Sequence, residues 1–523
     1  MQISVTKKYV VVPLGYHARH KKIIFSRNTE EGKQIVYDVF AAIDFLKPDY
    51  YGYLDISRFQ GETLELECDP ALDYMFEMID ELPKDGVYEE KYRPTAHFSA
   101  SYGWINDPNG CIYDEDTGLY HLFFQHNPVG HMWGNMHWGH AVSKDLLHWE
   151  EWDEALFSDE FGTMFSGSAI KNKDGDMMLF YTAAGGHNNL MSIGTRFTQC
   201  VAISKDGGKT FEKYENNPII PHVDAENRDP KVIYCPEIGA YVLALFLNGH
   251  EFAIYQSQDL LHWDLLQKLT MPGDDECPDF YPLYVDGDPS KKKWVFTAAH
   301  DHYFIGEMKD GKFVPETEEQ RLHYGKNSYA AQTFSGLQGE DGVGRRVRIA
   351  WNTTHAPFEP FNCSMCLPTQ MELKTIDDEL YLCSYPIAEV KNLWEESKEY
   401  VGMSDLETSL EGTAYDIELE LELQEDSVAT ISLFGMEIKC NAKENQITMD
   451  GAFMPMFYTG DVLKLRLFVD KLGVEIYEDQ GQAFMCNGAI SDYTLNNLSV
   501  KAAEGSLRIA NAKIHRQENI WGK

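Results

Sequence analysis

Short runs of alternating apolar and polar residues, ended by Gly, Asp or Pro, cover most of the chain. Between residues 106 and 351 this pattern recurs: a short polar motif, a strand, a turn and a more apolar strand, which is typical of a hairpin. Five segments share the plan: NDPNGCIYDEDTGLYHLFFQH, FSGSAIKNKDGDMMLFYTAAG, RDPKVIYCPEIGAYVLALFLNG, ECPDFYPLYVDGDPSKKKWVFTAAH and YAAQTFSGLQGEDGVGRRVRIAW.

A second repeated pattern follows several of these hairpins. It consists of a strand, the residues Ser-x-Asp, a turn and an aromatic residue. It is seen in WGHAVSKDLLHWEEW, CVAISKDGGKTFEKY and AIYQSQDLLHWDLL. Together the two halves make four-stranded units that recur about every 50 to 60 residues. We therefore predict an all-β protein whose centre is a five-bladed β-propeller.

The flanking regions are also rich in short strands but do not follow the repeat. Residues 1–92 are expected to form an N-terminal β-sandwich, residues 93–392 the propeller and residues 393–523 a C-terminal β-sandwich. The segments PKDGVYEEKYRP and PIAEVKNLWEESKEY are interpreted as the connections, and GWINDPNG as a turn before a strand.

The polar motifs that open the units carry acids. The first strand of each propeller blade lies nearest the axis, so the openings of the five units should converge on one pocket. Asp107, Asp229 and Glu276 are therefore predicted to meet, with Ser166 and Tyr329 at the two remaining openings. Carboxylates that face one another repel, and such an arrangement is most often kept for catalysis.

Two carboxylates in one pocket are what retaining glycoside hydrolysis requires, one as nucleophile and one as acid and base. Asp107 lies between Asn106 and Asn109, whose amides favour a carboxylate anion. Glu276 is the candidate proton donor, ahead of Asp274, Asp275 and Asp279 in DGDDECPDF.

These motifs resemble glycoside hydrolase family 32, the β-fructofuranosidases, which include invertases, inulinases and levanases. WINDPNG is similar to the nucleophile motif of that family, RDP to its transition-state-stabilising motif and EC to its acid/base motif. FSGSA, YAAQTF and HLFFQHNP are further matches.

The resemblance implies that Asp107 is the nucleophile, Glu276 the acid/base and Asp229 the transition-state stabiliser. It implies release of terminal β-D-fructofuranosyl units from sucrose, fructo-oligosaccharides or fructan (levan or inulin). Fructosyl transfer, hydrolysis of sucrose 6-phosphate and carbohydrate binding without catalysis remain alternatives. The implied substrate-binding residues are Asn106, Gln125, Trp133, Phe165, Ser166, Arg228, Tyr329 and Trp351.

The region before the nucleophile motif departs from the invertase pattern. About a hundred residues precede WINDPNG, and VPLGYHARHKKIIFS and YYGYLDISRFQGETLEL are similar to the extra N-terminal sandwich of some bacterial levanases and fructanases. This likeness favours fructan as the substrate.

The charge balance narrows the possible partners. Acids outnumber bases 83 to 45, giving a net charge of −38, which disfavours nucleic acid and phosphorylated sucrose as ligands. No apolar stretch approaches the roughly 20 residues that cross a membrane. An uncharged sugar or oligosaccharide is the expected partner, and the sequence gives no indication of the oligomeric state.

Histidines and cysteines suggest metal or redox chemistry only weakly. His121, His126, His131, His137 and His140 lie close together in sequence but lack an HExxH frame, and Cys363 and Cys366 form a single CxxC pair. We therefore expect no metal and no cofactor.

The first residues, MQISVTKKYVVVPLG, contain two lysines and an apolar run but no small-residue cleavage site. Ten scattered cysteines do not form a disulfide framework. Both features predict a cytoplasmic protein, although a trimmed secreted chain would look the same.

Overall fold

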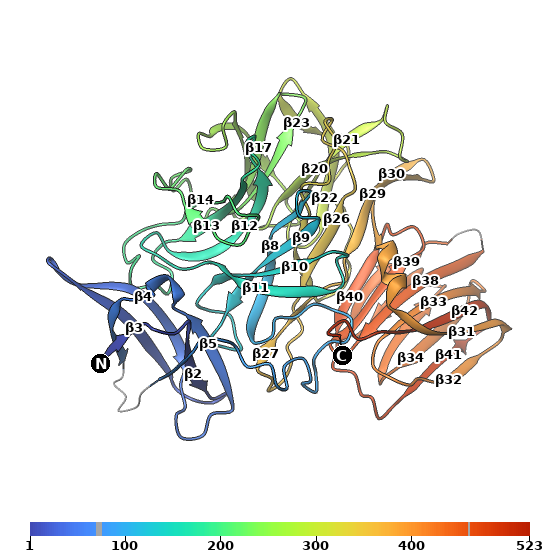
Figure 1. Cartoon of the computed structure of the whole chain (residues 1–523). Coiled ribbons are helices and arrows are strands. Elements are labelled where there is room, and N and C mark those ends of the chain that lie inside the picture. The colour runs from blue at the N-terminus through green and yellow to red at the C-terminus, as the bar shows by residue number, and fades with distance from the viewer. Residues whose placement is uncertain (70–75, 459–460, 523) are drawn as a thin grey trace.

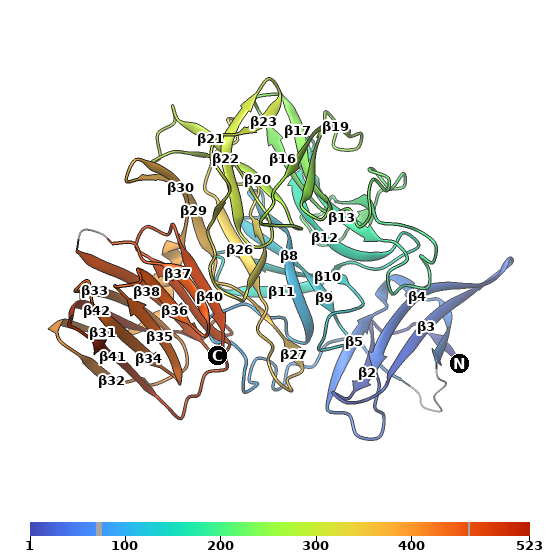
Figure 2. The same cartoon turned by 180° about the vertical axis from the view of Figure 1, so that it is seen from behind.

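The computed structural model describes residues 1–69, 76–458 and 461–522, and in these residues the chain is built almost entirely of β-strands. The prediction of an all-β protein is confirmed. Three groups of sheets follow one another along the chain: blue N-terminal sheets, a central group and orange C-terminal sheets (Figure 1). The view from behind shows the same order, with the first and last groups on opposite sides of the central one (Figure 2).

Two sheets enclose a hydrophobic core in the N-terminal region. Alternating residues of the strands supply this core, among them Val10, Val12, Phe25 and Leu64. One sheet has the order β1 (Gln2–Ser4), β6 (Thr63–Asp69), β3 (His20–Thr29), β4 (Gly32–Ala42), and the other the order β5 (Tyr50–Asp55), β2 (Tyr9–Leu14), β7 (Glu77–Ile79). A short 3-10 helix, η1, spans Ser57–Phe59.

The central region consists of five antiparallel meanders. Their strands in order are β8 (Gly103–Asp114), β9 (Leu119–Asn127), β10 (His137–Ser143) and β11 (Trp149–Leu156); β12 (Thr163–Lys171), β13 (Met177–Ala184), β14 (Thr198–Ser204) and β15 (Glu212–Lys213); β16 (Arg228–Cys235), β17 (Ala240–Asn248), β18 (Glu251–Ser257) and β19 (Asp264–Thr270); β20 (Asp279–Tyr284), β21 (Lys292–Thr297), β22 (His302–Lys309) and β23 (Lys312–Pro315); and β25 (Ser328–Thr333), β26 (Val347–Asn352), β29 (Thr369–Ile376) and β30 (Glu379–Pro386). Three short strands extend these sheets: β24 (Gln320–Arg321), β27 (Phe361–Asn362) and β28 (Ser364–Met365).

The first strands of the five meanders contact one another in a closed order, β8, β12, β16, β20, β25 and back to β8. Buried side chains join them. Ser168 Oγ donates to Pro230 O at 2.8 Å, and Gln332 joins Cys111 N at 3.1 Å to Gly167 O at 2.9 Å. The openings of all five meanders are therefore held around one centre.

Irregular pairing marks the start of four of these first strands. The register shifts between Ile105 and Pro108 in β8, between Phe165 and Gly167 in β12, between Arg228 and Lys231 in β16, and between Tyr329 and Gln332 in β25. GWINDPNG is thus part of a bulged strand, and its interpretation as a turn is wrong. A bulge leaves a residue unpaired and redirects its side chain, which is how Asp107, Ser166 and Asp229 leave the sheet pattern.

Two six-stranded sheets form the C-terminal region and enclose a second large core. Their orders are β31 (Trp394–Met403), β42 (Leu507–Gln517), β33 (Tyr415–Leu423), β38 (Val462–Asp470), β39 (Gly473–Glu478), β40 (Phe484–Gly488), and β32 (Leu406–Ser409), β41 (Asn497–Glu504), β34 (Val428–Leu433), β35 (Met436–Asn441), β36 (Gln446–Met449), β37 (Ala452–Pro455). The segment interpreted as a connection, PIAEVKNLWEESKEY, holds the 3-10 helix η2 (Ala388–Leu393) and the edge strand β31. The helices in the described ranges are both short 3-10 turns, so none has the length or apolar character of a membrane span.

Candidate active site

The three predicted acids meet around one cysteine. Cys277 N donates to Asp229 Oδ2 at 3.0 Å, and Cys277 Sγ lies 3.5 Å from that oxygen and 3.8 Å from Asp107 Oδ2. The neighbouring Glu276 forms an ion pair with Arg228, whose Nε is 3.8 Å from Asp229 Oδ2. Residues from β8, β16 and the loop before β20, far apart in sequence, thus share one site.

Asp107 is held by side chains from two neighbouring strands. Ser166 Oγ donates to Asp107 Oδ2 at 2.5 Å, and Asn106 Nδ2 donates to Asp107 Oδ1 at 3.1 Å. Asn106 is itself oriented by Trp104, whose Nε1 donates to Asn106 Oδ1 at 2.9 Å. Both donors favour the carboxylate anion, the form that a nucleophile needs.

Glu276 lies between a cation and a phenol. Its Oε1 accepts from Arg228 Nη2, and its Oε2 accepts from the Tyr329 hydroxyl at 2.6 Å. The Glu276 carboxyl keeps partial access to solvent, whereas Asp229 is buried. This access suits exchange of a proton with a leaving group and then with water.

Burial and repulsion between carboxylates raise the pKa values of Asp107 and Asp229. Burial raises the pKa of Asp229 to about 7, with a further increase from the Glu276 and Asp107 charges that Arg228 partly offsets. Burial also raises the pKa of Asp107, and the hydrogen bonds from Ser166 and Asn106 oppose that shift. The cluster therefore holds fewer than three negative charges near neutral pH.

The backbone at the site is in an unusual conformation. Asp229 has φ 66°, Glu276 φ 50° and Cys277 φ 38°, all in the left-handed region that non-glycine residues rarely adopt. Ala330, next to Tyr329, has φ 53°. Such conformations cost free energy and cluster at functional sites, where the surrounding structure holds them in place.

Aromatic rings pack beside the residues that hold the acids. Trp133 packs edge-on against Phe165 at 5.9 Å and against His187 at 5.3 Å. On another side Trp351 lies 5.6 Å from Trp104 and 6.2 Å from Tyr329 between ring centroids. Rings of this kind offer the apolar faces on which sugars pack.

Gln125 occupies β9 opposite the bulge of β8, because its neighbours Phe124 and His126 pair with Pro108 and Ile105. Its amide nitrogen is buried and has no hydrogen-bond partner among the described residues. A buried donor without a partner is costly, and a bound hydroxyl group would satisfy it.

All the residues predicted for the site thus lie near the three acids, in contact with one another or across a strand from the β8 bulge. Sequence reasoning missed Cys277 and His187. Cys277 adjoins Glu276 in the EC motif, which was the signal that could have indicated it. His187 lies in a loop after β13, where strand periodicity gives no signal.

Known proteins are similar to this chain in sequence and in structure. The model of the glycosyl hydrolases family 32 N-terminal domain matches residues 97–386. A levanase of Bacillus subtilis (strain 168) is 32% identical over 498 residues, covering 83% of this chain and 72% of the levanase.

The chain belongs to glycosyl hydrolase family 32. It is therefore a glycosidase, and both the family and the enzyme class predicted from the motifs are confirmed.

Other members of family 32 show the same likeness. An extracellular exo-inulinase of Aspergillus niger is 26% identical over 522 residues, covering 83% of this chain and 96% of the inulinase. The crystal structure of exo-inulinase from Aspergillus awamori has a TM-score of 0.73 at 26% identity and covers 83% of this chain and all of that one. A fructofuranosidase from Schwanniomyces occidentalis, complexed with fructose, has a TM-score of 0.72 at 23% identity, covers 83% of this chain and 99% of that one, and shares the fold.

The prediction of a cytoplasmic protein is wrong, because it is contradicted by these family 32 relatives, several of which are named as extracellular enzymes. The residues on which it rested, an apolar run after two lysines, have a structural role. They form β2, whose Val10 and Val12 are fully buried in the N-terminal core.

The histidines of the metal hypothesis have other partners. His126 Nδ1 lies 2.9 Å from Glu154 Oε1, His137 Nε2 lies 2.7 Å from the Tyr37 hydroxyl, and His131 Nδ1 lies 3.0 Å from the Tyr50 hydroxyl. His121 and His140 contact each other at 3.0 Å, and burial lowers the pKa of His121 to about 4. These contacts join strands of the first meander to each other and to the N-terminal sheets.

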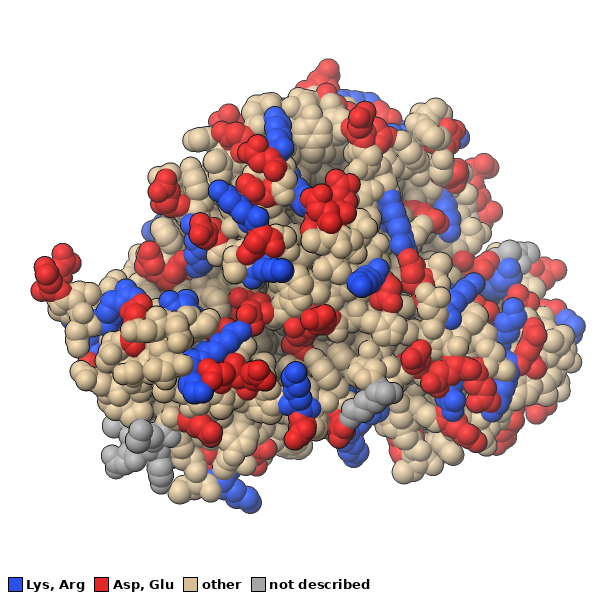
Figure 3. All heavy atoms as spheres, in the orientation of Figure 1, with Lys and Arg blue, Asp and Glu red and all other residues tan. Residues whose placement is uncertain are grey.

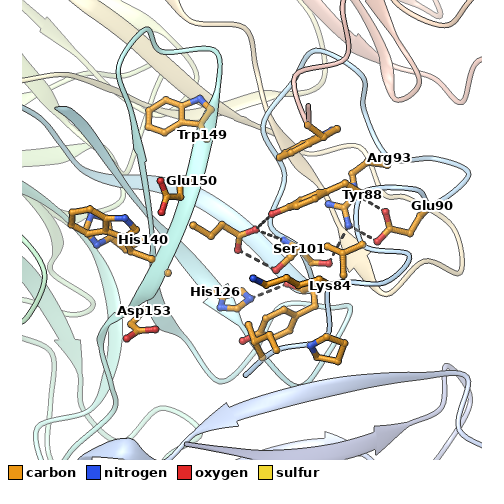
Figure 4. A pocket seen from close by; sticks show the side chains of 18 of the residues that line it. Lys84, Tyr88, Glu90, Arg93, Ser101, His126, His140, Trp149, Glu150 and Asp153 are labelled. Atoms are coloured by element: carbon orange, nitrogen blue, oxygen red, sulfur yellow. Dashed lines mark hydrogen bonds and ion pairs between the residues drawn. The ribbon is translucent and has the colours of Figure 1, made fainter. Parts of the chain in front are cut away.

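A cavity of about 1110 Å³ lies away from the acids, between the segment that precedes β8 and the outer strand β11. Figure 4 shows Tyr88, Glu90 and Arg93 on one side of it and Trp149 and Asp153 on the other. None of the three acids lines it. This cavity is therefore separate from the cluster of acids at the centre of the meanders.

Proposed function

We propose that this family 32 enzyme is a retaining glycoside hydrolase that releases terminal β-D-fructofuranosyl units from sucrose, fructo-oligosaccharides or fructan such as levan and inulin. The observation that carries the proposal is the meeting of Asp107, Asp229 and Glu276 around Cys277. The names of the relatives, levanase and exo-inulinase, agree with it.

In the first step Asp107 attacks the anomeric C2 of the fructosyl unit, and the bond to the leaving oxygen breaks as Glu276 donates its proton to that oxygen. In the second step Glu276 takes a proton from water, the water oxygen attacks C2, and the ester to Asp107 breaks. Asp229 binds ring hydroxyls, and its charge stabilises the oxocarbenium-like transition state.

The walls of the fructosyl subsite position the ring for this attack. Aromatic side chains bind its apolar faces, and amides, the hydroxyl groups and the guanidinium bind its hydroxyls. The proposed substrate-binding residues are Asn106, Gln125, Trp133, Phe165, Ser166, Arg228, Tyr329 and Trp351.

We infer that the five meanders are the blades of a five-bladed β-propeller spanning residues 93–392, with β-sandwiches at 1–92 and 393–523. The closed order of contacts among the first strands supports this reading. So does the division of strands, because β7 ends at Ile79 and β31 begins at Trp394.

The alternatives differ from this proposal in the acceptor or the substrate. A fructosyltransferase would pass the fructosyl unit to a sugar, a sucrose-6-phosphate hydrolase would need a cationic pocket, and a carbohydrate-binding protein would lack turnover. Two relatives are named levanase and exo-inulinase, which favours the hydrolase.

Incubation of the purified protein with sucrose, levan and inulin, followed by separation of the products, tests the proposal. Free fructose from at least one of these substrates is expected. Longer fructosyl oligosaccharides in place of fructose would instead identify a transferase, and binding without any product would identify a carbohydrate-binding protein.

A further inference from the structure

The N-terminal sheets hold two loops of the acid site. Phe40 of β4 exchanges two hydrogen bonds with the Asn135 side chain, both at 2.8 Å. Asp38 Oδ1 accepts from Leu190 N at 3.0 Å, and Lys22 Nζ donates to Asn188 O at 3.1 Å. The first loop carries Trp133 and the second carries His187, so β4 fixes the two segments whose rings pack beside Phe165.

The loop between β2 and β3 reaches the site from another direction. Tyr16 lies 4.9 Å from His131 and 5.4 Å from Phe358, and His17 lies 6.0 Å from Phe358. The segment that carries Phe358 is tied to the first loop, because Asn362 Nδ2 donates to His131 O at 2.6 Å.

This segment leads directly to the nucleophile. His355 lies 5.1 Å from Trp104, which orients Asn106 beside Asp107. A continuous series of contacts therefore joins the N-terminal residues to the catalytic acids.

Several rings along this series are exposed to solvent. Phe40 is 46% exposed, Trp133 43% and Phe358 67%. His20 is stacked on Phe40 at 5.0 Å. Phe358 also has φ 58°, a backbone conformation that is rare for a bulky residue and costs free energy. Exposed apolar side chains gathered on one surface mark an interaction or ligand-binding site.

We propose that these rings bind the sugar units of a fructo-oligosaccharide or fructan that lie beyond the bond being cleaved. The aromatic rim is defined as Tyr16, His17, His20, Phe40 and Phe358, and it lies next to the loop that carries Trp133 of the fructosyl subsite. Most of its members come from the N-terminal sheets, which lie outside the segment matched by the family model. The N-terminal region is thus part of the substrate-binding site for long substrates.

The occupant follows from the position and chemistry of the rim. The rim adjoins the loop of Trp133, which packs against Phe165 beside Ser166, so the rest of the same sugar chain is the molecule placed to reach it. Lys22, which lies over the Phe40 ring, is paired with Asp38 Oδ2 at 2.8 Å. This inference rests on the proposed function, because it takes the same substrate class.

Phe40→Ala, Phe358→Ala and the double variant test the rim with sucrose and with fructo-oligosaccharides of increasing length. Loss of these ring contacts should raise KM for the longest oligosaccharides about 3- to 10-fold, with kcat nearly constant and the smallest change for sucrose. Phe40→Tyr should restore the wild-type KM. Phe453→Ala, which removes an equally exposed ring from the C-terminal sheets, should change nothing.

Binding in an Asp107→Asn background separates this inference from the proposed function. Calorimetry with long inulin and levan oligosaccharides should show weaker binding in the rim variants even if no turnover exists. A loss that is equal for sucrose and long chains, or no loss at all, would overturn the inference. A change in the mass of the protein in solution, with unchanged sugar binding, would show instead that the rim joins two copies of the chain.

Discussion

Asp229 is a buried carboxyl, and its ionisation destabilises the folded state. Its pKa is raised from an ordinary value of 3.8 to about 7, so between these values the folded chain keeps a proton that the unfolded chain has released. The contribution of this group to the free energy of unfolding is therefore present below its ordinary pKa and is lost as the pH rises through 7.

We predict that Asp229→Asn raises Tm, and that the increase grows from about pH 4 to about pH 8, with a free-energy gain of at most about 4 kcal/mol. Fructosidase activity should be largely lost. Asp174→Asn, in an exposed turn, is the control. Thermal unfolding at several pH values measures the effect, and a gain that is larger at low pH would contradict the assignment.

Ser166 tunes the nucleophile through one hydrogen bond. Ser166→Ala removes a donor to Asp107, which should raise the pKa of Asp107 further and move the acidic limb of the pH–rate profile to higher pH. A decrease of kcat/KM of about tenfold is expected, as for hydrogen bonds to charged groups. Ser290→Ala, which removes a serine bonded to the surface residue Asp288, should leave the profile unchanged. An unshifted acidic limb in the Ser166 variant would show that this bond does not act on the nucleophile.

At the scale of strands, buried polar contacts connect the first strands of the meanders. Lys231 of β16 donates to Thr333 O of β25 at 2.7 Å and lies 3.4 Å from Asp279 Oδ2 of β20. Both charged side chains are almost fully buried, so each depends on the other.

Lys231→Met should lower the free energy of unfolding by about 3 to 5 kcal/mol, because it leaves Asp279 buried without its cation. The double variant Lys231→Met, Asp279→Leu should recover part of that loss. Denaturant unfolding provides the measurement. A single variant as stable as wild type would show that the pair does not join the strands.

Strand patterns also explain what could be predicted from sequence. The repeat located the openings of the meanders and so brought Asp107, Asp229 and Glu276 together. It could not reveal the bulges, because Asn106, Asp107 and Pro108 interrupt the alternation in the same way as a turn. Strand β31 was not predicted, because it is a largely exposed edge strand whose charged residues show little alternation with apolar ones.

At the scale of the whole molecule, sequence predicted three β-rich regions but gave no role to the first. The contacts of β4 with the loops of Trp133 and His187 are long-range, and no local pattern encodes them. The net charge of −38 predicts a surface without a large basic area. On the face in Figure 3, acidic and basic side chains are interspersed, with no continuous basic area. This surface agrees with a neutral ligand.

We predict that the enzyme cleaves single terminal units, because the acids lie where the first strands of five meanders converge, and a pocket enclosed by five strands would admit only a chain end. A time course with levan or inulin should give free fructose from the first time points while the polymer shortens slowly. Early di- and trisaccharides without fructose would reveal an open cleft and internal cleavage.

The most direct measurement of the central claim is to trap the fructosyl–enzyme ester. In a Glu276→Ala variant, fructosyl fluoride can still react, because fluoride leaves without a proton, but water is no longer activated. Mass spectrometry of the digested protein should find one fructosyl unit on the peptide that contains Asp107, and none when Asp107→Asn is added. An adduct on another acid, or fluoride release with no adduct at any time, would contradict the assignment of Asp107 as the nucleophile.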